Sequence, residues 1–325
     1  MSRILVTGAS GIVGYGILRS LKKSALEYFL MGSSIYGDSA APAFCDVFKQ
    51  APMTSSPDYS SWLIATVSKY KIDIVIPGIE ADMHHFAVNY NSLVEAGVRP
   101  MLNRESLILL CKDKWQFYTE AKRAGLRCLI LSKVEGQFAS LSAELGLPFL
   151  LKPREGFGSK GIEIVKCEAD FDHHSEHLGS KLMAQPIIGD DENEFTIGAF
   201  CDGVGGYFAA IGLKRSLSDS GFTAKAEVTD ISPFEPSLKE LCGVFKPEGP
   251  TNFQFRLGAD GPLLLEINPR ISSSTSIRTA FGYNESQMAV EYFLEQTAPK
   301  QPDILGGMAV RYNDEVIFYE DSTNI

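Results

Sequence analysis

The stretch that decides the fold reads Asn252-Phe-Gln-Phe-Arg-Leu257, then Gly258-Ala-Asp-Gly261, then Pro262-Leu-Leu-Leu-Glu-Ile-Asn268-Pro-Arg270. Two runs in which apolar and polar residues alternate lie on either side of an Asp-Gly pair. That arrangement is typical of two antiparallel strands joined by a tight turn. The stretch therefore predicts a β-hairpin whose second strand ends in Asn-Pro-Arg.

The register of this hairpin follows from the pairing that puts like residues together. With Gln254 opposite Glu266, one face is apolar and the other carries oxygen-bearing side chains. The apolar pairs expected in this register are Phe253 with Ile267, Phe255 with Leu265, and Leu257 with Leu263. Gln254, Glu266 and Asn268 then share one patch, and their oxygens suit a hard cation such as Mg²⁺. A solvated sheet face is the alternative, but it does not account for the arginine that follows, Arg270.

A second stretch suited to phosphate lies upstream. Residues 148–152 predict a short strand that ends in Lys152, and a glycine-rich loop runs from Arg154 to Gly161. Backbone amides of such a loop can approach phosphate because no Cβ atoms obstruct them, and the lysine supplies a positive charge. A flexible hairpin turn would have a similar composition. The loop is not a Walker loop, which has Gly-Lys-Ser/Thr at the start of a helix.

The rest of the chain divides into two kinds of structure. Up to about residue 100, strands expected at 3–7, 28–33 and 72–77 alternate with helices that end near 23, 70 and 96, which indicates a parallel sheet. Asp113 and Gln116 have the spacing of a capping box at the start of a connecting helix. After Gly125 short strands dominate, which indicates antiparallel sheets of the α+β class. These strands are expected at 127–131, 148–152, 162–166, 194–201, 207–213, 223–229, 251–257 and 263–268, with helices near 138–145, 237–245 and 285–296.

Together these elements resemble the ATP-grasp superfamily, and within it the synthetase domains of the carbamoyl-phosphate synthase large subunit. The elements that carry the resemblance are Asp113-Lys114, Leu147-Pro-Phe-Leu-Leu-Lys152-Pro153 with its glycine loop, Met183-Ala-Gln-Pro-Ile-Ile188, Glu194-Phe-Thr196, Asn252-Phe-Gln254-Phe and Glu266-Ile-Asn268-Pro-Arg270. The resemblance implies an α/β, Rossmann-like parallel-sheet domain over residues 1–103 and an α+β ATP-grasp domain over residues 104–325. Within the latter it implies a small lid subdomain at about 126–184 and a large subdomain with the hinge and metal site at about 185–325.

The resemblance also implies roles at the matching positions, with ATP and Mg²⁺, or Mn²⁺ in its place, as cofactors. The expected phosphate and glycine-loop residues are Lys114, Lys152, Gly156, Gly158, Ser159 and Gly161. The expected hinge residues, which would hold adenine, are Gln185, Pro186, Ile187 and Ile188, with Glu194 or Glu192 on the ribose. The expected metal ligands are Gln254, Glu266 and Asn268. Arg270 and Lys152 are the expected catalytic residues.

The reaction implied is the ATP-dependent ligation of a small carboxylate to an amine or similar nucleophile, through an acyl phosphate. One departure restricts the substrate. Ser273 stands where the synthase family typically has a second arginine, so bicarbonate is not expected as the carboxyl substrate. Arg278 is an arginine that could replace it. A kinase-like or non-ligating ATP-binding protein is an alternative, which a stable phosphorylated product would reveal.

A nicotinamide-dependent dehydrogenase or epimerase is the other alternative. Thr7-Gly8-Ala-Ser-Gly11-Ile-Val-Gly14 matches the dinucleotide fingerprint, and Tyr118 and Lys122 have the spacing of a catalytic pair. Against it, the second strand ends in two serines, with no acid for a ribose. In the ligase, the turn from Gly8 to Gly11 and Glu80 are expected to border the cleft for the acceptor substrate, because α/β sheets bind ligands at the carboxyl ends of their strands.

Composition excludes several other classes. The formal net charge of the 325 residues is −10, which argues against general nucleic-acid binding. No apolar run reaches the roughly 18 residues of a membrane span, and there is no signal-peptide pattern. The 6 cysteines form no Cys-x-x-Cys pair and are expected to be reduced thiols. We therefore expect a cytoplasmic protein with small-molecule substrates, no membrane or nucleic-acid partner, and a homodimer as the default assembly.

Overall fold

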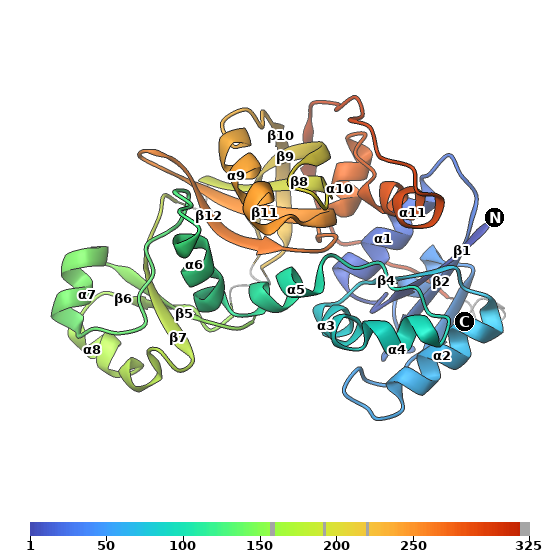
Figure 1. The fold of residues 1–325 in the computed structure, drawn as a ribbon, viewed down its shortest axis with the longest axis horizontal. Coiled ribbons are helices and arrows are strands. Elements are labelled where there is room, and N and C mark those ends of the chain that lie inside the picture. The colour runs from blue at the N-terminus through green and yellow to red at the C-terminus, as the bar shows by residue number, and fades with distance from the viewer. Residues whose placement is uncertain (157–159, 191–192, 219–220, 319–325) are drawn as a thin grey trace.

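The computed structural model describes residues 1–156, 160–190, 193–218 and 221–318. These contain three β-sheets, which follow one another in the order parallel, three-stranded and six-stranded as the chain is traced (Figure 1). None of the helices in these ranges is long and apolar enough to cross a membrane.

The first sheet is parallel and has the strand order β3-β2-β1-β4. Its strands are β1 (Ser2–Thr7), β2 (Tyr28–Ser34), β3 (Val47–Gln50) and β4 (Ile74–Pro77). The helices beside it are α1 (Ile12–Lys22), α2 (Tyr59–Tyr70), α3 (Glu80–Val88), α4 (Tyr90–Glu95) and the short 3₁₀ helix η1 (Ala41–Phe44). Ile4 and Val6 belong to one core and Leu5 to another, so β1 is buried on both faces, as a parallel strand between layers of helices must be. The predicted parallel sheet is confirmed.

One predicted helix of this region is wrong. The segment at 83–96 forms two helices rather than one, and the break falls at Asn89. The Asn89 side chain donates to the carbonyl of His85 at 2.9 Å. Asparagine side chains compete in this way with the backbone hydrogen bonds of a helix, which accounts for the break.

The second sheet is small and antiparallel, with the order β6-β5-β7. Its strands are β5 (Phe149–Pro153), β6 (Glu163–Val165) and β7 (Leu182–Pro186), flanked by α7 (Phe138–Leu145), α8 (Glu168–Asp172) and the 3₁₀ helix η2 (Ser175–His177). It has an apolar core of its own. Helices α5 (Glu105–Lys112) and α6 (Lys114–Arg123) connect it to the parallel sheet. The predicted strand at 127–131 is wrong, because that segment pairs with a sheet through one isolated bridge, from Leu129 to Leu264, and forms no continuous ladder.

The third sheet has six strands in the order β12-β11-β8-β9-β10-β13. Its strands are β8 (Glu194–Asp202), β9 (Tyr207–Leu217), β10 (Thr223–Thr229), β11 (Glu248–Gly258), β12 (Gly261–Asn268) and β13 (Met308–Val310). The associated helices are α9 (Glu235–Phe245), α10 (Thr275–Ala280) and α11 (Glu285–Glu295). Every strand pairing in this sheet is antiparallel, as predicted.

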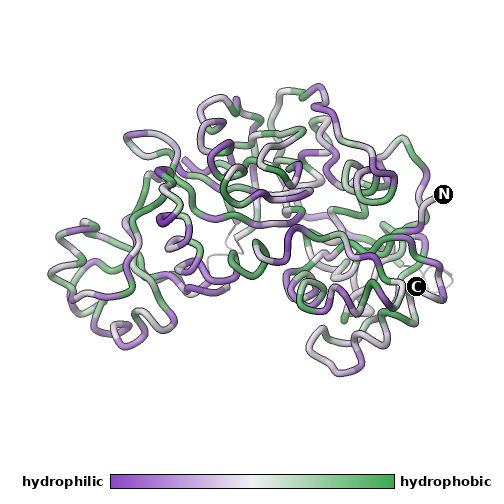
Figure 2. Tube along the Cα trace, in the orientation of Figure 1, coloured by the Kyte–Doolittle hydropathy of each residue, from purple (hydrophilic) through white to green (hydrophobic). Residues whose placement is uncertain are grey.

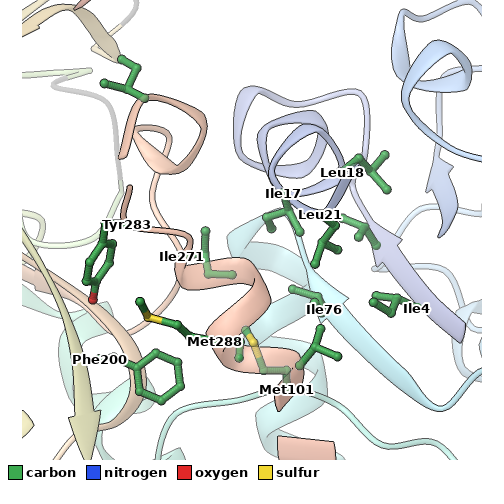
Figure 3. Close-up of a cluster of buried hydrophobic side chains, with 14 of the residues drawn as sticks. Ile4, Ile17, Leu18, Leu21, Ile76, Met101, Phe200, Ile271, Tyr283 and Met288 are labelled. Carbon is green, nitrogen blue, oxygen red and sulfur yellow. The ribbon is translucent and has the colours of Figure 1, made fainter. Parts of the chain in front are cut away.

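The largest apolar core joins the parallel sheet to the six-stranded sheet. Figure 3 shows Ile4, Leu18 and Leu21 on one side of this cluster and Tyr283 and Met288 on the other. The tube of Figure 2 is coloured as hydrophobic along much of the parallel strands, as expected for buried strands. Ser20 of α1 reinforces the packing, because its hydroxyl accepts a hydrogen bond from Thr279 and its carbonyl accepts one from the Asn284 side chain. The two sheets therefore share one interior.

Candidate functional site

A cleft of about 660 Å³ lies where the three sheets approach one another. Its lining comes from β5 and β7 of the small sheet, from β11 and β12 of the six-stranded sheet, and from α3 and α5. That volume is within the usual range for small-molecule sites. The cleft is therefore the candidate functional site.

The β11–β12 hairpin forms one wall of the cleft. Gln254 faces Glu266 and Phe253 faces Ile267, as predicted. The register then shifts by one residue, so that Phe255 pairs with Leu264. The predicted pairs of Phe255 with Leu265 and Leu257 with Leu263 are wrong, because a β-bulge inserts one residue into β12. Leu264 is thereby buried in the core, whereas Leu265 lines the cleft.

The three expected metal ligands, Gln254, Glu266 and Asn268, all line the cleft. Asn268 Nδ2 donates to Glu266 Oε1 at 3.0 Å. Burial raises the pKa of Glu266, but Lys114, the Asn268 amide and further cations outweigh it, and the net pKa lies below the usual value. One ionised carboxylate beside two side-chain amides is a donor set that suits Mg²⁺ whose remaining ligands are phosphate oxygens and water. No cluster of three His, Cys, Asp or Glu side chains with metal-binding geometry occurs in the described ranges.

Lys152, at the end of β5, is only 8% exposed and lines the cleft. Burial lowers the pKa of Lys152 to about 8, with Glu266 opposing the shift. Lys114, the first residue of α6, donates from Nζ to the carbonyl of Gly156 at 2.7 Å. Gly156 lines the cleft and Gly161 does not, while Gly158 and Ser159 lie outside the described residues. The two expected phosphate-binding lysines, Lys114 and Lys152, thus line the same cleft.

The start of the glycine loop is tied to the start of α6. Asp113 is the N-cap of α6, as predicted, and accepts from the amides of Trp115 and Gln116. Its carboxylate also forms an ion pair with Arg154. The backbone amide of Lys114 donates to the carbonyl of Arg154 at 2.9 Å. The cap therefore sets the position of the loop as well as that of the helix.

The expected hinge, Gln185 to Ile188, also lines the cleft. Glu194 also lines it, but its carboxylate is already paired: Oε1 accepts from Arg215 at 2.7 Å and Oε2 from Arg256 at 3.3 Å. The other expected ribose ligand, Glu192, lies outside the described residues. The sequence motifs did not indicate that Arg215 belongs to the site. Its position in the largely apolar strand β9 is the one sequence feature that could have indicated a buried, paired arginine.

Two basic residues proposed for the phosphoryl group differ in their placement. Arg270 lines the cleft, and its Nη2 donates to Glu80 Oε1 at 2.7 Å. Arg278 is fully buried, and its guanidinium donates to Glu285 and Asn252. It does not line the cleft, whereas Ser273 does. Arg278 therefore does not supply the second arginine that Ser273 replaces.

The amino-terminal glycine motif has a packing explanation. A Cβ atom at Gly14 would lie 2.4 Å from the carbonyl oxygen of Gly8, and one at Gly78 would lie 2.4 Å from that of Thr7. These glycines let α1 approach the ends of β1 and β4 closely. The turn from Gly8 to Gly11 is not part of the cleft lining, but Val13 and Glu80 are.

Parts of the sequence are similar to known proteins. A family model described as "ATP-grasp in the biosynthetic pathway with Ter operon" matches residues 180–316. The uncharacterized protein y4rH of Sinorhizobium fredii is 28% identical over 151 residues, which cover 41% of this chain and 30% of that protein. The carbamoyl phosphate synthase large chain of Vibrio cholerae is 25% identical over 228 residues, covering 65% of this chain and 21% of that protein. The match thus spans less than a third of either relative.

Two solved structures have a similar fold. N5-carboxyaminoimidazole synthetase from Staphylococcus aureus, in complex with ADP, superposes with a TM-score of 0.71 at 17% identity, over 94% of this chain and 80% of that one. Biotin carboxylase from Campylobacter jejuni, in complex with a nucleotide, gives a TM-score of 0.73 at 16% identity, over 93% and 73% of the two chains.

Proposed function

We propose that this chain, which carries an ATP-grasp domain and is homologous to the carbamoyl phosphate synthase large chain, is an ATP-dependent ligase that joins a small carboxylate to an amine. The observation that carries the proposal is that one cleft brings together Lys152, the Gln254–Glu266–Asn268 patch and Arg270. A buried lysine, a hard-cation site and an arginine are the groups that phosphoryl transfer needs.

The charge of the cleft supports a polyanionic nucleotide. The basic residues of its lining are Lys112, Lys114, Lys152, Lys160, Arg215, Arg256 and Arg270. The acidic ones are Glu80, Glu155, Glu194 and Glu266. The cleft is therefore basic, although the whole chain has a net charge of −10. A local excess of cations attracts a nucleotide triphosphate without making the protein a general anion binder.

In the proposed reaction, a substrate carboxylate oxygen attacks the γ-phosphorus of ATP, ADP leaves, and an acyl phosphate forms. An amine then attacks the acyl carbon, and phosphate leaves. Lys152 and Arg270 would offset negative charge on the transferred phosphoryl oxygens. Gln254, Glu266 and Asn268 would hold Mg²⁺, which when bound supplies charge neutralisation at the phosphates. No side chain has to act as a nucleophile, and the lid that carries the glycine loop would exclude water.

We extend the proposal to the remaining parts of the molecule. The hinge backbone from Gln185 to Ile188 would hold adenine, and Glu194 or Glu192 would contact ribose. Gly156, Gly158, Ser159 and Gly161 would close over the phosphates. Residues 1–103 would form a Rossmann-like domain and 104–325 the ATP-grasp domain, with 126–184 as the lid subdomain and 185–325 as the large subdomain. A cytoplasmic homodimer would be the working form.

A coupled assay of ADP release tests the function. The twenty common amino acids and short aliphatic carboxylates serve as carboxyl substrates, and amino acids and ammonium as amines, each with MgATP. We expect Glu266→Gln and Lys152→Ala to abolish ADP release, and the same changes at the exposed pair Glu235→Gln and Lys239→Ala on α9 to leave it intact. Unchanged turnover in both cleft variants would overturn the assignment. A stable phosphorylated product without an amide would identify a kinase instead.

A further inference from the structure

One face of the small three-stranded sheet forms a wall of the cleft. Ala184 of β7 and Leu151 of β5 are buried in the apolar core on the other face of this sheet. Side chains alternate between the two faces of a strand, so the neighbouring Gln185 and Leu150 point away from that core. Both of them line the cleft. Leu150 pairs with Gln185 on one side and with Ile164 of β6 on the other, which places these three side chains in one row across the cleft face.

Gln185 is the polar member of an otherwise apolar set. Ile164 lines the cleft together with Leu150. Ile130 and Leu265 also line it, and both border a small cavity of about 30 Å³ together with Gln185. Hydrocarbon side chains therefore surround the amide of Gln185. An apolar slot with one polar side chain suits a flat heteroaromatic ring, because the hydrocarbon contacts the ring faces and the polar group contacts an atom on the ring edge.

The side-chain amide of Gln185 is fixed through its nitrogen. Gln185 and Ser132 are both buried, with exposed fractions of 7% and 2%. Gln185 Nε2 donates to Ser132 Oγ at 2.7 Å, and Ser132 Oγ donates to the carbonyl of Ile130 at 3.0 Å. Within the described ranges, Ser132 is the only donor to that carbonyl. If the amide were rotated so that Ser132 donated to Gln185, the carbonyl of Ile130 would lose its hydrogen bond, which is unfavourable.

The amide oxygen of Gln185 is the atom that remains for a ligand. Oε1 has no hydrogen-bond partner in the part of the chain that the structure describes, and it is not fully buried. Because the side chain lies on the cleft face of the sheet, this oxygen is accessible from the cleft. An amide oxygen accepts hydrogen bonds and does not donate them. It is therefore complementary to an amino group on the edge of a ring, and it is not complementary to a carbonyl oxygen at the same place.

We propose that the side chain of Gln185 selects the nucleobase by accepting a hydrogen bond from the exocyclic amino group of adenine, and that Ser132 is a positioning residue that holds the amide in this orientation. This inference rests on the proposed function, which assigns the hinge backbone to adenine, and it adds the side chains that distinguish ATP from other nucleotides. A base with a carbonyl oxygen in place of the amino group would bring two acceptors together and leave both unpaired.

The dissociation constants of MgADP and of the magnesium complex of inosine diphosphate test the proposal. Inosine carries a carbonyl oxygen where adenosine carries the amino group, so the ratio of the two constants reports on this contact. Isothermal titration calorimetry on the whole chain measures both. We expect the wild-type protein to bind the adenosine nucleotide more tightly by about tenfold or more. Gln185→Leu should remove this preference, because the adenosine nucleotide loses its hydrogen bond and the inosine nucleotide loses an unfavourable contact.

Ser132→Ala tests the positioning role. Without the hydroxyl, the amide of Gln185 can rotate and offer Nε2 to the carbonyl oxygen of inosine. We therefore expect the inosine nucleotide to bind this variant more tightly than it binds the wild-type protein. A general loosening of the fold would weaken the binding of both nucleotides and would not produce this gain. Ser132→Thr keeps a hydroxyl at the same position and should restore the preference for the adenosine nucleotide.

Ser142→Ala is the matched control. Ser142 lies on α7, beside the same small sheet, and its hydroxyl donates to the carbonyl of Ala139 at 3.2 Å, outside the cleft lining. This variant should keep the wild-type ratio. An unchanged ratio in Gln185→Leu would overturn the base contact, and an unchanged ratio in Ser132→Ala would overturn the positioning role. Equal binding of the two nucleotides by the wild-type protein would overturn both. If the wild-type protein bound neither nucleotide, the proposed function itself would fall.

Discussion

Glu194 on β8 and Arg215 on β9 form a buried ion pair, with Arg215 Nη2 2.7 Å from Glu194 Oε1 and side chains 7% and 5% exposed. Arg256 on β11 pairs with the other carboxylate oxygen and also donates to the carbonyl of Ile188. The pair therefore belongs to a polar connection from the hinge to three neighbouring strands. Through Arg256, Glu194 is thereby linked to the carbonyl of Ile188 in the hinge.

We predict that Glu194→Gln lowers the free energy of unfolding by about 3–5 kcal/mol, because it leaves a buried arginine without its counter-charge. Urea denaturation measures the change. Glu235→Gln is the control, since it removes an exposed carboxylate paired with Lys239 and should cost less than about 1 kcal/mol. Equal losses in the two variants would contradict the prediction.

A second buried pair joins Arg278 on α10 to Glu285 on α11, with side chains 0% and 1% exposed. We predict that Arg278→Met destabilises the protein by about 3–5 kcal/mol, since Glu285 is then buried and unpaired. The double variant Arg278→Met/Glu285→Leu should be more stable than the Arg278→Met single variant, because no lone charge remains. Denaturation of both variants and of Glu285→Leu completes the cycle, and simple additivity would refute the coupling.

The lowered pKa of the buried Lys152 makes the free energy of unfolding depend on pH. Burial lowers its pKa to about 8 from an ordinary 10.5. Between these two values the unfolded chain binds more protons than the folded one, so the free energy of unfolding gains a contribution that rises with pH, by at most about 1.4 kcal/mol per pH unit. Below about pH 8 both states are protonated and the contribution is flat. Lys152→Met should remove this rise in urea denaturations from about pH 7 to about pH 10, whereas Lys239→Met should retain it.

Asn268→Ala should raise the Mg²⁺ concentration needed for half-maximal ADP release by about tenfold or more, because one of the three proposed metal ligands is lost while Gln254 and Glu266 remain. A magnesium titration at saturating ATP measures this. Asn193→Ala, which removes an amide bonded to Asp190 outside the cleft lining, is the control. An unchanged magnesium requirement in Asn268→Ala would remove that residue from the metal site.

Local patterns predicted much of the fold. The Asp-Gly turn and the apolar alternation identified the β11–β12 hairpin, and the pairing of Gln254 with Glu266 is confirmed. The bulge was not predictable, because Leu263, Leu264 and Leu265 are identical in the sequence. Which of them enters the core depends on what packs beneath the sheet. Asn89 is a residue type that disfavours helix interiors, but the helical periodicity of the flanking residues predicted one continuous helix instead of α3 and α4.

The site was predictable only where its residues lie in short motifs. Lys152 and Asn268 belong to such motifs, and they line the cleft. Their roles stay predictions. The pair of Arg270 with Glu80 spans 190 positions in the sequence, so no periodicity or spacing could indicate it. Such contacts exist only once the hairpin and the parallel sheet are packed together.

The shared core has a consequence for how the protein is made. Ser20, in α1, receives hydrogen bonds from the side chains of Thr279 and Asn284, each at 2.9 Å, and Ile17 belongs to the same apolar cluster as Met288. A ribosome adds about 5–20 residues per second and releases the amino-terminal part first. During synthesis, the apolar face of α1 therefore waits for many seconds without the helices that cover it. The amino-terminal unit can complete its interior only after α10 and α11 have been translated.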